Sequence, residues 1–197
     1  MTRERQQGSW GAFFATLALI VLMATWAFVP AKVVEEAWQS EQRQVLAIAG
    51  ERSDAWIKSQ VAGLLADAAR AAAQDAGKLG DSGLERWLKG RIYMSVLWLS
   101  LIAYRASELL MWMLLGIPLI LAASVDGFYV REIRKTAFIS QSPIRHKIGV
   151  HFFRFVSIAT IVMLLMPLPL PIITAPAVVV FFAISLWLWM ANLQKRI

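Results

Sequence analysis

Cysteine is absent from this sequence, and histidine occurs only twice in 197 residues. The chain therefore has no disulfide, no thiolate metal site and no cysteine nucleophile. The two histidines, His146 and His151, are close in sequence but have no carboxylate near them. Because a zinc site needs three or four converging ligands, we expect no bound metal ion.

Charged residues are also scarce. They make up 17% of the chain, whereas 58% of the residues are hydrophobic. A soluble domain has about 25% charged and about 45–50% apolar residues. This composition predicts an integral membrane protein.

The formal net charge of +7 is confined to a few short segments. Between residues 31 and 91, nine basic and nine acidic residues cancel, so the excess lies in the N-terminal tail, in residues 126–154 and in Lys195-Arg196. Lysine and arginine near a membrane end are retained on the cytoplasmic side. The excess therefore predicts the orientation of the chain, and it does not require a nucleic-acid ligand.

Sequence motifs of catalysis are missing as well. No phosphate-binding loop, no H-E-x-x-H zinc motif and no G-x-S-x-G nucleophile motif occurs. The apolar segments hold no Asp or Glu at mid-depth, which a proton relay or an ion carrier would usually need. We therefore predict a protein that is not an enzyme and that binds no cofactor.

The first apolar segment, residues 10–29, contains 20 residues without a charge. A helix of this length crosses a hydrocarbon core of about 30 Å. A cleaved signal peptide is the alternative, because Val29-Pro30-Ala31 resembles a small-residue cleavage site. We favour an uncleaved anchor, since the apolar run is longer than a typical signal-peptide core. Residues 1–30 are then a cytoplasmic tail and a first transmembrane helix.

Residues 31–106 are predicted to form an extracytoplasmic helical segment. Apolar residues recur there at helical spacing in two stripes, the first of them less regular. The stripes are Val34, Trp38, Val45 and Ile48 or Ala49, and then Ile57, Val61, Leu64, Leu65, Ala68 and Ala72. Either they pack on each other or on the membrane surface, or they dock against a partner's extracytoplasmic domain.

A new helix is predicted to begin after Ser82. Three glycines interrupt the preceding helix, and Ser82 with Glu85 fits a capping box, in which each side chain accepts a hydrogen bond from the other residue's backbone N–H. A helix from there to residue 123 would be about 60 Å long, roughly twice the hydrocarbon thickness. We therefore expect its first half outside the membrane and residues 107–124 inside it.

Two charges lie where this helix enters the membrane. Arg105 and Glu108 are spaced so that they can pair on a helix. We expect them at the interface, where arginine reaches the headgroups, and contact with another helix or subunit is the alternative. Beyond the span, Asp126-Gly127 is a turn signal that leads into a basic cytoplasmic connector, residues 127–149.

The connector carries the cations that we predict to form an interaction surface. They are Arg131, Arg134, Lys135, Arg145 and Lys147. Within the connector, Ser142-Pro143 is typical of a helix start, so a third membrane helix is predicted to begin there.

Alternating prolines end this third helix. Pro167, Pro169 and Pro171 lack backbone donors and disfavour helix at the residues before them, which predicts a tight extracytoplasmic reversal and a fourth helix over residues 176–191. Residues 107–197 thus hold three membrane helices. The predicted fold is an all-α integral membrane protein with four transmembrane helices, an extracytoplasmic helical segment between the first and second, and both termini in the cytoplasm.

Several of these segments resemble a known family. Val125-Asp126-Gly127, the run from Arg131 to Lys135, Arg145-His146-Lys147 and the proline-rich turn are similar to those of the integrating conjugative element membrane proteins. These are bacterial inner-membrane proteins with an uncharacterised domain, carried by mobile elements that encode type IV secretion machinery. The resemblance covers mainly residues 82–197. It implies an inner-membrane location and a role in conjugative DNA transfer alongside the coupling ATPase, and it supplies no catalytic residues.

The leading functional hypothesis is a non-enzymatic inner-membrane subunit of a conjugation apparatus. Its partners would be membrane lipid, other transfer proteins and the coupling ATPase, and assembly into a homo-oligomer remains open. We rank contact of the connector with DNA below contact with protein or lipid headgroups, because aromatic residues that stack on bases are sparse there. The rival hypotheses are a small transporter or channel subunit and a membrane-bound regulator such as an exclusion factor, and neighbouring genes would distinguish them.

Overall fold

The computed structural model describes residues 16–80, 82–137 and 143–193. Regular structure in these ranges is entirely helical, which confirms the predicted all-α class. The elements are an N-terminal helix (Thr16–Phe28), α2 (Ala31–Lys78), α3 (Gly83–Thr136), α4 (Pro143–Leu165) and α5 (Thr174–Ala191).

Three helices in the described part are long and apolar enough to cross a membrane, namely α3, α4 from Lys147 to Leu165, and α5. The N-terminal helix meets α2 at a break where the chain turns by 97°, and the two add a fourth candidate if they are taken as one span. Residues 10–15 of the first predicted span lie outside the described residues. The chain is therefore suited to three or four membrane crossings, and the four-span topology stays a prediction.

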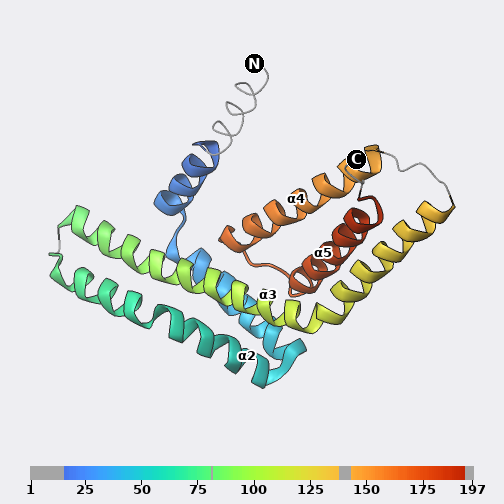
Figure 1. Cartoon of the computed structure of the whole chain (residues 1–197). Coiled ribbons are helices and arrows are strands. Elements are labelled where there is room, and N and C mark those ends of the chain that lie inside the picture. The colour runs from blue at the N-terminus through green and yellow to red at the C-terminus, as the bar shows by residue number, and fades with distance from the viewer. Residues whose placement is uncertain (1–15, 81, 138–142, 194–197) are drawn as a thin grey trace, which may run out of the picture.

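The long helix α3 is the axis of the fold (Figure 1). Its first half lies against α2 and its second half against α5, and α4 packs mainly on α5. The helix bends in its middle and contains Pro118, which removes one backbone hydrogen bond and crowds the preceding turn. We call α2 with the first half of α3 (residues 31–106) the arm, and the rest of α3 with α4 and α5 the bundle.

Within the arm, α2 folds back on itself at Gly50. The backbone angles there are φ 81° and ψ 171°, a combination that is essentially restricted to glycine. The residues after Gly50 run back beside the first half of α3 (Figure 1). The two stripes that the sequence shows therefore belong to two helices, and this glycine is the break between them.

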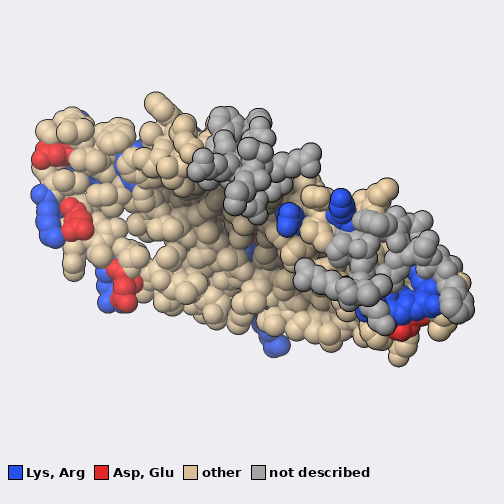
Figure 2. Space-filling view, turned by 45° about the horizontal axis from the view of Figure 1, so that its top comes forward, with Lys and Arg blue, Asp and Glu red and all other residues tan. Residues whose placement is uncertain are grey.

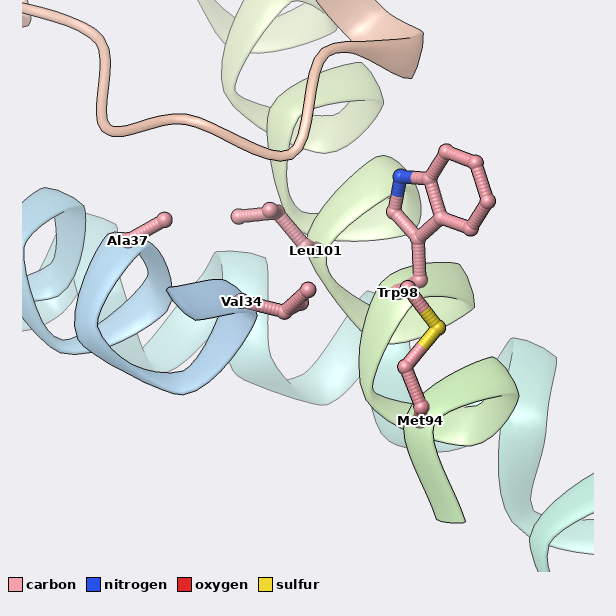
Figure 3. Close-up of a cluster of buried hydrophobic side chains, with 5 residues drawn as sticks. All are labelled: Val34, Ala37, Met94, Trp98 and Leu101. Atoms are coloured by element: carbon pink, nitrogen blue, oxygen red, sulfur yellow. The ribbon is translucent and has the colours of Figure 1, made fainter. Parts of the chain in front are cut away.

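Two clusters of buried apolar side chains hold the arm together. The first joins the start of α2 to α3 (Figure 3), and the second joins both parts of α2 to α3. Full burial of one such side chain contributes about 1.5–3 kcal/mol. Leu64, which the sequence pattern places in one stripe with Ile57 and Val61, is 68% exposed and does not join the second cluster. The clusters consist of Val34, Ala37, Met94, Trp98 and Leu101, and of Val45, Ile57, Val61 and Tyr104.

The N-terminal helix is fastened to α3 by Arg91. Its Nη1 donates hydrogen bonds to the backbone oxygens of Trp26, Ala27 and Val29 over 2.8, 3.1 and 3.0 Å. These carbonyls lie at a helix C-terminus, where intrahelical partners are missing. Trp26 Nε1 also donates to Ser95 Oγ over 2.8 Å. The sharp turn into α2 is thus held by side chains of α3.

The predicted turn at Asp126-Gly127 is wrong, because α3 continues through both residues to Thr136. Gly127 lies against α5, where an added Cβ would come within 2.9 Å of the Trp187 backbone oxygen. Asp126 accepts a hydrogen bond of 2.6 Å from Trp187 Nε1. The glycine therefore permits a close contact between two helices and does not reverse the chain.

Charged side chains gather at the two ends of the face shown in Figure 2. Basic and acidic groups alternate at the free end of the arm, and basic groups dominate near the end of α3. The broad region between them is almost without Asp or Glu. On this face the acidic groups are thus confined to the two ends, whereas a few basic groups also occur between them.

Candidate functional site

A buried ion pair joins the two helices of the arm at the place where the arm meets the bundle. Arg105 of α3 and Glu41 of α2 are 2% and 4% exposed. The Arg105 Nη2 donates to Glu41 Oε1 over 2.6 Å, and its Nε donates to Oε2 over 3.0 Å. The planar guanidinium fork matches the two carboxylate oxygens, so this contact is both strong and directional.

The same guanidinium holds the end of α4. Arg105 donates to the backbone oxygens of Met163 over 2.9 Å and Leu168 over 2.5 Å, and also to that of Met166. The last carbonyls of a helix have no intrahelical partner, and the prolines that follow prevent the helix from continuing. Arg105 therefore satisfies carbonyls that the connection between α4 and α5 leaves open. We call this connection (residues 166–173) the proline hairpin.

Two side chains of α2 bind the proline hairpin directly. Glu41 Oε1 accepts a hydrogen bond of 2.9 Å from the Leu170 N–H. Gln44 Oε1 accepts one of 2.9 Å from the Ile172 N–H, and Gln44 Nε2 donates to the Leu170 oxygen over 3.2 Å. Polar backbone groups that would otherwise be buried without partners are thereby satisfied. We call Glu41, Gln44 and Arg105 the hub.

Two further polar contacts flank the hub. Trp98 Nε1 donates to the Leu165 oxygen over 3.0 Å. The Tyr104 hydroxyl donates to Asp54 Oδ1 over 3.1 Å, and Asp54 also pairs with Lys58 over 2.6 Å. Burial, and then the charge of Asp54, raise the pKa of Tyr104 well above its ordinary value. The hydroxyl therefore keeps its proton and remains a hydrogen-bond donor.

The predicted pairing of Arg105 with Glu108 is wrong, because the ion-pair partner of Arg105 is Glu41. The spacing within α3 permits the local pair, but Glu41 offers the guanidinium a carboxylate, and the end of α4 with the proline hairpin offers it three carbonyls. Arg105 is also buried, so its side chain does not reach outward as a headgroup anchor would, and the predicted alternative of a contact with another helix is observed. Glu108 has no hydrogen bond within the described residues and lines a cavity of about 10 Å³ beside Glu41, which has room for one water molecule at most.

One cation of the predicted interaction surface has a structural role at the other end of the bundle. Arg134 Nη1 donates to the Ala191 oxygen over 3.3 Å and to Asn192 Oδ1 over 3.2 Å. These acceptors lie at the C-terminus of α5, where a positive charge is favoured by the helix dipole. Arg134 therefore fixes α5 to α3.

The other predicted cations that the structure describes do not bind a second helix through a hydrogen bond of the kind that Arg134 makes. Lys135 pairs with Glu132 on the same helix, and Arg131 is partly buried with an Nε that has no partner in the described part. Lys147 is exposed on α4. The side chain of Arg145 and the predicted helix cap Ser142 lie outside the described residues, although α4 does begin at Pro143 as predicted. The joint role of the five predicted cations as an interaction surface stays a prediction.

The predicted capping box is present at the start of α3. Ser82 Oγ accepts from the Glu85 N–H over 3.3 Å, and Glu85 Oε2 accepts from the Ser82 N–H over 3.0 Å. The hydrogen bonds from Ser82 lower the pKa of Glu85 below its ordinary value. The predicted reversal is also present, since Pro167, Pro169 and Pro171 lie in the non-helical stretch between α4 and α5.

The sequence reasoning missed Glu41, Gln44 and Asp54. A signal for the two carboxylates existed, because each stands inside an apolar stripe: Glu41 falls between Trp38 and Val45, and Asp54 comes one turn before the next stripe. A carboxylate on a buried face is costly unless it is paired. Its position therefore predicts a partner, but the stripe does not say which residue that partner is.

These features define a class of protein. It is all-helical in the described part, with three helices long and apolar enough to cross a membrane and a two-helix arm fixed by buried polar contacts to the turn between two of them. The sequence profile of one family, described as IncC plasmid conjugative DNA transfer protein DtrJ-like, matches residues 15–194. The chain belongs to this DtrJ-like family, and membership points to a role in conjugative DNA transfer.

The match confirms the resemblance to a conjugation-associated family, while the narrower assignment to the integrating-element membrane proteins stays a prediction. Searches of curated proteins and of solved structures return no match to this chain.

Proposed function

We propose that this protein is a non-enzymatic inner-membrane component of a conjugative DNA-transfer apparatus and that it works beside the coupling ATPase. The observation that carries the proposal is the family match, which covers the arm, the hub and the bundle together. The bundle helices supply the apolar length for a membrane location, and the basic end of α3 supports a cytoplasmic orientation of that end.

The continuity of α3 supports a scaffolding role. Its 54 residues extend for about 80 Å at 1.5 Å per residue, from the free end of the arm to the basic end of the bundle. The hub fixes the arm to the proline hairpin, so the arm is not a loosely tethered domain. In this proposal the free end of the arm contacts a partner outside the membrane, and the basic end of the bundle contacts the ATPase in the cytoplasm.

Single-cysteine labelling tests the proposed membrane placement. The chain has no native cysteine, so Ser59→Cys on the exposed surface of the arm and Thr136→Cys at the end of α3 each report alone. In spheroplasts, an impermeant maleimide should label position 59 at once and position 136 only after permeabilisation. Labelling of position 136 in intact spheroplasts contradicts the proposed orientation.

Crosslinking with a tagged coupling ATPase tests the proposed partner. Arg131→Gln/Lys135→Gln removes two cations of the predicted surface but leaves Arg134, which holds α5. This variant should lower the yield of crosslinked ATPase. The matched control is Lys32→Gln/Arg70→Gln, which removes two exposed cations of the arm and should leave the yield unchanged. Absence of any crosslink to the ATPase in the wild type would remove it as a partner.

A further inference from the structure

Glu108 is a buried carboxylate whose charge the hub does not balance. It is 7% exposed, and none of the hydrogen bonds within the described residues involves it. Its neighbours in the hub, Arg105 and Glu41, neutralise each other. One negative charge is therefore left over where the arm meets the bundle. A buried charge without a partner is costly, both in a protein interior and near a membrane.

The side-chain donors around Glu108 are already used. A guanidinium has five N–H groups, and those of Arg105 donate to Glu41 and to three backbone oxygens. The Gln44 amide donates to a backbone oxygen of the proline hairpin over 3.2 Å and to a serine hydroxyl of its own helix over 3.5 Å. The Thr174 hydroxyl donates to a hairpin oxygen over 2.6 Å. The Trp112 indole N–H, one turn further along α3, has no partner in the described part, but a neutral donor does not cancel a charge.

The cavity of about 10 Å³ beside Glu108 has a wall of oxygen-bearing groups. It lies where α2, α3, α4, the proline hairpin and α5 meet, and its side-chain oxygens come from Glu41, Gln44, Glu108 and Thr174. Glu41 and Arg105 are the other charged residues of the wall, and the lining residues of α4, the hairpin and α5 have no titratable side chain. An occupant of this cavity has to be about the size of a water molecule. It also has to accept electron pairs, as a cation does.

We propose that this cavity binds one small monovalent cation, either a sodium ion or a proton, with the Glu108 carboxylate as its anionic ligand. One positive charge balances the negative charge that the hub leaves over. A divalent ion takes about six or more oxygen ligands and would leave a positive charge in its turn. Unwound segments and helix ends bind sodium ions and protons in membrane transporters, and the proline hairpin is such a segment. The sequence-based expectation of no bound metal ion concerned the two histidines and does not bear on oxygen ligands.

Binding of the cation should stabilise the contact of the arm with the bundle. Without it, two carboxylates, Glu41 and Glu108, border one small cavity, and both are attracted to the guanidinium of Arg105. Like charges in a buried site repel each other, and one of them is then best neutralised. The stability of the folded chain should therefore depend on the concentration of the cation.

Thermal unfolding of the full chain in mild-detergent micelles tests a sodium ion as the ligand. Circular dichroism follows the melting temperature while sodium chloride replaces N-methyl-D-glucamine chloride at constant ionic strength and pH. A ligand that binds only the folded state stabilises it in proportion to the logarithm of its concentration, once that exceeds the dissociation constant. The melting temperature of the wild type should then rise by about 3–5 °C for each tenfold increase in sodium.

The same assay in sodium-free buffer tests a proton as the ligand. In that case sodium has no effect, and the folded chain holds a proton that the unfolded chain has released. Stability then falls as the pH rises. The melting temperature of the wild type should fall by about 3–5 °C for each pH unit between about pH 5.5 and neutrality, relative to a chain that lacks the carboxylate.

The variant Glu108→Gln is that chain. Its amide is neutral, has nearly the same shape and supplies its own donors, so the variant should lose the response to sodium or to pH. Glu108→Met, which also lacks the charge, takes its place if Glu108→Gln does not fold. The matched control is Glu36→Gln, which removes an exposed carboxylate of α2 and should respond as the wild type does.

Two results would overturn the proposal. The first is a wild type whose melting temperature responds to sodium and to pH no more than that of Glu108→Gln. The second is a control variant, Glu36→Gln, that loses the response to the same extent as Glu108→Gln. The measurements use purified protein and do not involve mating, so a failure of the proposed transfer role would leave their outcome unchanged.

Discussion

Replacing Arg105 by methionine removes the positive charge of the hub and keeps an unbranched side chain in its place. Glu41 then becomes a carboxylate that is 4% exposed and whose remaining donor is the Leu170 N–H. Breaking a buried ion pair by removing one partner costs about 3–5 kcal/mol. Three backbone oxygens at the end of α4 and in the proline hairpin also lose their donor. We therefore expect Arg105→Met to destabilise the protein by a value in the upper part of this range.

The double variant Arg105→Met/Glu41→Met sharpens the test. Replacing both members of a buried pair by apolar side chains is often neutral or stabilising. The three backbone oxygens lack the Arg105 donor in both variants, and the Leu170 N–H, which loses its acceptor only in the double variant, costs about 1–3 kcal/mol. The double variant should therefore be more stable than Arg105→Met alone. This order of stabilities follows only if the cost of the single change comes from an unpaired buried charge.

The assay is reversible unfolding of the purified protein in mixed micelles, followed by circular dichroism as denaturing detergent is added. The control is the exposed pair Lys32–Glu36, whose 3.8 Å contact joins side chains that are 83% and 64% exposed. Lys32→Met should change the free energy of unfolding by less than about 1 kcal/mol. Equal losses for Arg105→Met and Lys32→Met, or a double variant less stable than Arg105→Met, would refute the reasoning.

Three further predictions concern glycines and the helix cap. Gly127→Ala brings a Cβ within 2.9 Å of a backbone oxygen of α5, so it should lower the free energy of unfolding by about 1–3 kcal/mol in the same assay. Gly90→Ala is the control, because nothing lies within 4 Å of its added Cβ, and it should not weaken the packing of α3 on α5. Gly50→Ala should destabilise the protein by about 1–3 kcal/mol through its backbone angles alone. Gly63→Ala, where the added Cβ has open space in the same helix, should instead stabilise the protein by about 0.5–1 kcal/mol. Equal effects of the two changes would contradict the break of α2 at Gly50. The folded-state pKa of Glu85 is lowered, so the contribution of the capping box is present above the ordinary glutamate pKa and is lost as the pH falls through the lowered value. Amide exchange in the first turn of α3, corrected for its intrinsic pH dependence, should therefore lose protection at acid pH in the wild type, and Glu85→Gln should not show this loss.

Local sequence patterns predicted the features that are determined by residues close to one another in the sequence. The scarcity of charge and the length of the apolar runs are enough to indicate long apolar helices, because burying a chain in hydrocarbon requires both. The capping box at Ser82 and Glu85 and the reversal at the prolines are also local, since each is decided by residues within one turn. These predictions agree with the structure for that reason.

The hub could not be predicted from local patterns. The partners Arg105 and Glu41 are 64 residues apart in sequence, whereas the spacing rule for helices pointed to the nearer carboxylate of Glu108. Asp126-Gly127 failed in the same way, because a glycine that ends a helix and a glycine that admits another helix look identical in sequence. In each case the deciding atoms belong to a distant segment, here α2 for Arg105 and α5 for Gly127.

The most direct test of the central claim is the mating frequency of a donor with a clean in-frame deletion of this gene. The wild-type gene supplied in trans should restore a frequency that the deletion lowers. The Arg105→Met gene should restore it poorly, because the arm then loses the guanidinium that binds the end of α4 and the proline hairpin. Immunoblots of membrane fractions establish that each protein is present. An unchanged frequency in the deletion donor would contradict a required role in conjugative DNA transfer.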